Sequence, residues 1–74
     1  MDRLFKNLRL MDSRVEDSKR MHREGATIQT YSLHESEELM RALVERRCYD
    51  AVDMTSSWSK STGYIFEVSV WWND

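Results

Sequence analysis

The C-terminal segment, residues 64–74, constrains the fold of this chain more than any other stretch. Side chains alternate between the two faces of a β-strand, so this segment would present one wholly apolar face. That face carries Tyr64, Phe66, Val68, Val70 and Trp72. The opposite face carries Ile65, Glu67, Ser69 and Trp71. We therefore predict a terminal strand that covers a hydrophobic core, with Trp72 closing the core near the end of the sheet.

A second strand, residues 48–58, precedes the polar stretch 59–63, which ends in Gly63 and predicts a hairpin loop. Pairing Trp58 with Tyr64 brings Val52 opposite Val70 and gathers the apolar side chains, Trp58 included, on the core face. A shift of one residue would destroy this match, so the register is predicted as well. The outer face of the hairpin would then hold Tyr49, Ala51, Asp53, Thr55, Ser57, Ile65, Glu67, Ser69 and Trp71.

Two helices and a short strand account for the rest of the chain. Residues 2–23 read as a helix ended by Gly25, with an apolar stripe that weakens toward its C-terminal third. Residues 26–31 alternate and predict a strand. Ser32 and Glu35 form a capping-box pattern that begins a second helix over residues 33–47. Its inward-facing residues would be Leu39, Met40, Leu43 and Val44.

The predicted architecture is an α+β two-layer sandwich with the order α-β-α-β-β. A three-stranded sheet carries the helices on one face and leaves the other face open. We expect one domain over residues 1–74, made of an N-terminal helix, residues 1–24, and a β-α-β-β unit, residues 25–74. The first strand could lie beside the second, in parallel, or beside the third, antiparallel.

The composition and the N-terminal residues indicate the cellular compartment of the protein. The single cysteine, Cys48, excludes an internal disulfide and favours a reducing compartment. The chain has no run of about 18 apolar residues that could span a membrane. Its charged N-terminus is unlike a signal peptide. We therefore expect a small cytoplasmic protein without a membrane partner.

The cysteine, histidine, acidic and glycine residues do not follow the spacing of a known catalytic, metal-binding or phosphate-binding motif. Cys48 and His34 fall at opposite ends of the second predicted helix, about 20 Å apart at helical rise. His34 and Glu38 could share a helix face, but two ligands do not make a metal site. The two glycines lie in no phosphate-binding loop. We predict no catalytic, metal-binding or cofactor-binding residues, and hence no enzyme.

Protein binding is the function that the sequence favours. Tyrosine and tryptophan are side chains that often anchor protein interfaces. Exposing a tryptophan to water on the open face costs free energy unless another surface covers it. The candidate partner-binding residues are Trp71, Ile65, Tyr49, Tyr31, Glu67 and Asp53. A second copy of the chain could also cover this face, which leaves a structural homodimer as one alternative.

Nucleic-acid binding is another alternative, because basic residues concentrate at the N-terminus. Residues 1–25 hold seven basic and five acidic side chains, whereas residues 26–74 hold four basic and eight acidic ones. The candidate contacts are Lys19, Arg20 and Arg23. The acidic Asp53 and Glu67 on the open face argue against this alternative, since they repel phosphates.

The segment Glu24-Gly25-Ala26-Thr27-Ile28-Gln29-Thr30-Tyr31-Ser32-Leu33 resembles a pattern of small phage proteins. In anti-CRISPR proteins of this kind, a strand ends in Ser-Leu and leads into a helix and a hairpin. The resemblance covers roughly residues 24–72, and the long N-terminal helix and the lack of a lysine-rich surface depart from it. It implies an inhibitor, acting in the host cytoplasm, that occludes a surface of a larger protein or ribonucleoprotein such as a CRISPR effector.

Overall fold

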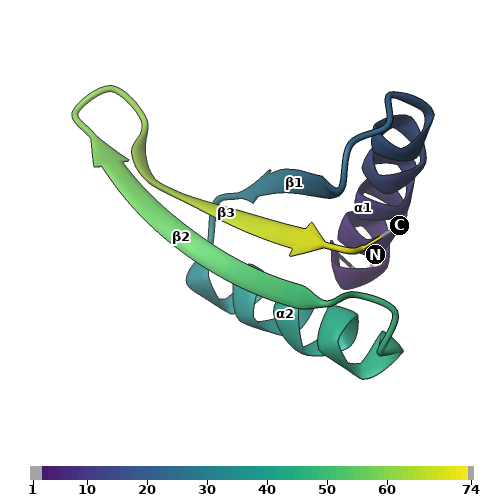
Figure 1. Ribbon diagram of the computed structural model, residues 1–74. Coiled ribbons are helices and arrows are strands. Elements are labelled where there is room, and N and C mark those ends of the chain that lie inside the picture. The colour runs from purple at the N-terminus through teal and green to yellow at the C-terminus, as the bar shows by residue number, and fades with distance from the viewer. Residues whose placement is uncertain (1–2, 74) are drawn as a thin grey trace.

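The computed structural model describes residues 3–73, which form two helices and three strands in the predicted order (Figure 1). The elements are α1 (Arg3–Arg20), β1 (Gly25–Thr30), α2 (Leu33–Arg46), β2 (Ala51–Ser59) and β3 (Gly63–Trp71). The α+β class and the order of the elements are therefore as the sequence predicts.

The three strands form an antiparallel sheet with the order β1-β3-β2. The open question is thus settled, because the first strand lies beside the third. The predicted hairpin register is confirmed, with Trp58 opposite Tyr64 and Val52 opposite Val70. On the other side of β3, Ile28 of β1 is opposite Val68. The C-terminal strand β3 therefore occupies the centre of the sheet, between β1 and β2.

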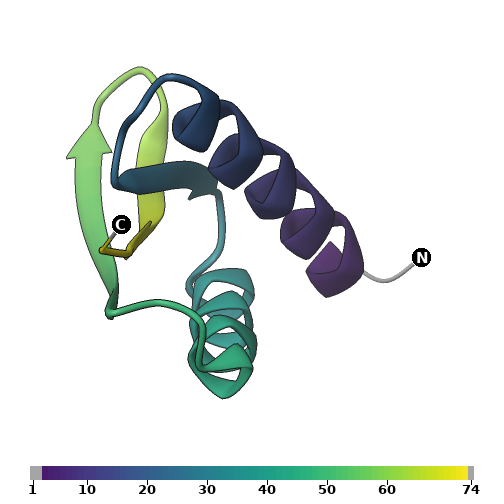
Figure 2. The same ribbon diagram turned by 45° about the vertical axis from the view of Figure 1, so that its right-hand side comes forward.

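Both helices lie on one side of the sheet and enclose the core against it (Figure 2). α1 contributes Met11 and Val15 to this core, and α2 contributes its fully buried leucines. Trp72 is only 7% exposed and closes the core after the end of β3, as predicted. The buried hydrophobic residues are Met11, Val15, Ile28, Leu39, Leu43, Val68, Val70 and Trp72.

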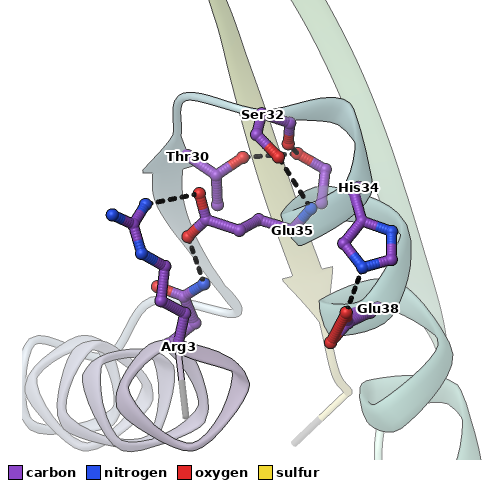
Figure 3. A network of polar contacts seen from close by, with 8 residues as sticks. Arg3, Thr30, Ser32, His34, Glu35 and Glu38 are labelled. Carbon is purple, nitrogen blue, oxygen red and sulfur yellow. Dashed lines mark hydrogen bonds and ion pairs between the residues drawn. The ribbon is translucent and has the colours of Figure 1, made fainter. Parts of the chain in front are cut away.

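The start of α2 differs in one detail from the predicted capping box. The Ser32 hydroxyl accepts a hydrogen bond from the Glu35 backbone N–H, as expected. The Glu35 carboxylate, however, accepts hydrogen bonds from Arg3 and Asn7 of α1 (Figure 3). It therefore links the two helices. Further along α2, Val44 is exposed, so its predicted place in the core is wrong.

The β2–β3 hairpin extends beyond the rest of the fold (Figure 1). The pairing of β1 with β3 ends where Thr30 meets Phe66, two residues short of Tyr64. Trp58 and Tyr64 are consequently 63% and 64% exposed. Trp58 lies on the apolar face of the sheet, but its predicted place in the core is wrong because neither helix reaches this end of the hairpin.

Candidate functional site: a hollow beside Trp71

The face of the sheet opposite the helices carries four of the predicted partner-binding residues. Trp71, Glu67 and Ile65 alternate along β3, and Asp53 of β2 is opposite Ser69. Asp53 is exposed, whereas Glu67 and Ile65 are half-buried. Trp71 is 43% exposed. The tryptophan is therefore the largest accessible side chain on a face that is otherwise mostly polar.

Trp71 is positioned by the glycine opposite it. Gly25 of β1 pairs with Trp71. A Cβ atom added at Gly25 would lie 2.9 Å from Cδ1 of the indole, which is closer than such atoms approach in folded proteins. The absence of a side chain at position 25 thus lets the indole lie across the backbone of β1 and reach the edge of the sheet.

A hollow of about 450 Å³ opens beside the indole, at the β1 edge of the sheet and along the C-terminal half of α1. Ser18 of α1 is buried here and its hydroxyl donates a hydrogen bond to the Gly25 carbonyl, which holds the helix against β1. We call this the Trp71 hollow. Its lining residues are Arg14, Asp17, Ser18, Met21, Arg23, Gly25, Ala26, Thr27 and Trp71.

The Trp71 hollow has a positive balance of charge. Its one acidic side chain, Asp17, forms an ion pair with Arg20 at 2.9 Å. Arg14 and Arg23 form no ion pair with any residue in the described range 3–73. The hollow therefore offers two guanidinium groups next to an indole and the exposed side chain of Met21. Tryptophan, arginine and methionine are the side chains enriched at protein interfaces.

Tyr49 does not lie on the open face, so that prediction is wrong. β2 begins at Ala51, and the alternation of a strand cannot be extended to a residue in the preceding loop. The Tyr49 ring packs against Trp72 at the edge of the core, with 6.3 Å between the ring centroids. Burial raises the pKa of its phenol, in keeping with this position.

Tyr31 and Ile65 lie far from Trp71. Tyr31 is 70% exposed and follows the end of β1, whereas Trp71 pairs with the first residue of that strand. Six residues of strand separate the two sites by about 20 Å. The predicted partner-binding residues therefore form no single patch, and Trp71 alone adjoins the hollow.

The three predicted nucleic-acid contacts also have separate surroundings. The Lys19 ammonium lies 5.6 Å from the centroid of the Trp72 ring, and Arg20 is paired with Asp17. Of the three, only Arg23 lines the Trp71 hollow. The structure thus places Arg23 with Trp71, two residues that the sequence assigned to different functions.

Arg14 and Met21 belong to the site although the sequence alone did not predict them. Arg14 of α1 and Met21, the residue just after its end, follow the spacing i, i+4, i+7 with Ser18 and so lie on one side of the helix. Ser18 interrupts the apolar stripe of that helix and docks on Gly25. A small polar residue within the buried stripe was the available signal that a strand backbone comes close at this point.

Other candidate groups are dispersed. Within residues 3–73, no three histidine, cysteine, aspartate or glutamate side chains are placed to hold a metal ion. His34 pairs with Glu38 at 2.6 Å on the surface of α2, and Cys48 is exposed with a free thiol. Neither helix of the described chain has the length and apolar character needed to cross a membrane.

No protein-family model matches the chain, and comparisons with curated proteins and with solved structures also give no match.

Proposed function

We propose that this protein is a non-enzymatic protein-binding module that engages its partner through the Trp71 hollow. One observation carries the proposal: an accessible indole and two arginines without ion-pair partners among residues 3–73 line the same concave surface. A central aromatic anchor beside arginines is the usual composition of an interface hot spot. The hydrogen bond from the Ser18 hydroxyl to the Gly25 carbonyl fixes α1 against β1 and so preorganises this surface.

The hollow suits a partner segment that carries a carboxylate next to an apolar side chain. Arg14 and Arg23 would bind the carboxylate, since guanidinium groups form paired hydrogen bonds with carboxylate oxygens. Trp71 and Met21 would cover the apolar group. Binding of this kind would occlude a surface of a larger protein or ribonucleoprotein complex. This is the mode of action expected of a phage-type inhibitor in the host cytoplasm.

The proposal is tested by purifying the tagged chain from the cells in which it is made and identifying the proteins recovered with it. The native chain is compared with Trp71→Ala and Arg23→Ala. Phe5→Ala is the matched control, because Phe5 is a 61% exposed aromatic on α1 away from the hollow. We expect a partner that is recovered with the native chain and the control and is lost with both hollow variants. Equal recovery with all four chains would refute a role for the hollow.

A nucleic-acid strand is the second candidate partner, because the same surface could stack a base on Trp71 and bind phosphate through Arg14 and Arg23. Asp53 and Glu67 on the adjoining face oppose it. The discriminating measurement is the affinity for a single-stranded oligonucleotide across a salt series. Binding that falls steeply with salt and is lost with Trp71→Ala would favour this candidate over a protein partner.

A further inference from the structure

β2 is an outer strand that carries few of the features by which proteins protect a sheet edge. Natural edge strands are usually short, bulged, or interrupted by proline and lysine. β2 has nine residues, and all nine pair with β3 in an unbroken register. The chain contains no proline, and Asp53 is the only charged residue of β2. This edge is therefore open to pairing with another strand.

The backbone groups that face outward from β2 follow from the register. The Trp72 N–H donates to the Glu24 carbonyl, which continues the β1–β3 pairing. Even-numbered residues of β3 thus direct their backbone groups toward β1, and odd-numbered residues direct theirs toward β2. In β2 the odd-numbered residues bond to β3. The four even-numbered residues, Val52, Met54, Ser56 and Trp58, present their N–H and C=O groups to the outside.

We propose that β2 pairs antiparallel with β2 of a second copy, forming a dimer with a two-fold axis at Thr55. This register overlaps the whole strand, residues 51–59. It places Val52 opposite Trp58 of the second copy and Met54 opposite Ser56, so all four outward-facing residues find hydrogen-bond partners. A shift of two residues in either direction leaves one of the four facing a residue outside the strand. The product is a continuous six-stranded sheet.

The side chains of β2 are complementary in this register. Asp53 lies opposite Ser57 of the second copy, so the only charges in the two strands do not oppose each other. Trp58 comes beside Val52 of the second copy, which is half-buried at the edge of that copy's core. Aromatic and β-branched side chains are favourable cross-strand neighbours. The dimer therefore covers the indole that the monomer leaves 63% exposed at the end of its hairpin.

The oligomeric state across concentration tests this proposal, by light scattering coupled to size exclusion and by analytical ultracentrifugation. We expect twice the 8.9 kDa mass of the chain at high concentration. Thr55→Lys places two like charges at the two-fold axis, where the strands approach most closely, and should weaken the dimer about ten-fold. Gln29→Lys is the matched control, because Gln29 lies in the same row of the sheet on the far edge, opposite the shared neighbour Glu67. It should leave the dimer unchanged.

Two further measurements test the register. Ser57→Lys brings an ammonium opposite Asp53 of the second copy and should tighten the dimer. Amide hydrogen exchange should slow with rising concentration at residues 52, 54, 56 and 58 and not at their odd-numbered neighbours. A chain that stays monomeric up to about 1 mM, or a dimer that Thr55→Lys leaves intact, would overturn the proposal. The proposed function is independent of this result, since the Thr55→Lys monomer retains the Trp71 hollow.

Discussion

The two edges of the sheet are protected to very different degrees. β1 is six residues long, α1 packs along it, and Ser18 binds the carbonyl of its first residue. β2 is nine residues long, and all but two of its residues are exposed. The contrast follows from where the elements lie, because α1 packs against β1, and the β2–β3 pairing continues beyond the point where β1 ends. One edge is covered by α1, and the other remains exposed.

The same contrast separates the two ends of the β2–β3 hairpin. Where both helices lie beneath the sheet, side chains such as Val68 and Val70 are fully buried. Where the hairpin passes beyond them, the cross-strand pair Trp58–Tyr64 remains in contact with solvent. Stability should therefore depend on the covered part, and the pairing of two copies of the chain on the uncovered part.

The largest effect should come from the core beside the protected edge. Met11 of α1 is fully buried, so Met11→Ala should lower the free energy of unfolding by about 2–5 kcal/mol, through lost burial and the cavity left behind. Denaturation by urea measures the change. Leu10→Ala, at a neighbouring residue that is 42% exposed, serves as the control and should cost clearly less. Similar losses for the two variants would contradict the placement of α1.

An intermediate effect is expected where α1 seals the edge of β1. Ser18→Ala removes the donor to the Gly25 carbonyl and should cost about 1–2 kcal/mol, because a partly buried acceptor loses its partner. Ser13→Ala changes an exposed serine of the same helix and should be neutral or slightly stabilising. If Ser18→Ala were also neutral, the protection of this edge would not depend on the hydrogen bond.

The smallest effect on the monomer should come from the uncovered end of the hairpin. At low concentration, Trp58→Ala should change the free energy of unfolding by less than about 1 kcal/mol, since the indole is mostly exposed. For the native chain, Tm should rise with protein concentration, as expected when only the folded state associates. Trp58→Ala should weaken this dependence. A large loss of stability at low concentration would instead place Trp58 in a core.

The parts of the fold that could be predicted are those specified by neighbouring residues. The polar loop ending in Gly63 and the alternating strands on both sides determined the register, and Ser32 marked the start of α2. The place of β1 beside β3 could not be predicted, because both arrangements bury the same apolar face. The exposure of Trp58 depends on how far the helices extend over the sheet, which the alternation of side chains does not record.

For the candidate site, the sequence predicted the face of Trp71 but not its surroundings. Alternation along β3 was enough to place the indole on the open side. The hollow also requires α1 to dock beside β1, which brings Arg14 and Arg23 close to Trp71 of β3, a residue distant from both in the sequence. Tyr49 was predicted on the open face because side chains alternate along a strand. That alternation holds only within β2, which begins at Ala51, and Tyr49 lies in the loop before it.

The three tryptophans differ widely in their contact with water: Trp58 is 63% exposed, Trp71 43% and Trp72 7%. Their fluorescence should differ accordingly, because indole emission shifts to shorter wavelengths as water is excluded. Variants that retain one tryptophan, with phenylalanine at the other two positions, would each report a different event without an added label. The emission of Trp72 would follow unfolding, that of Trp71 partner binding, and that of Trp58 the pairing of two copies.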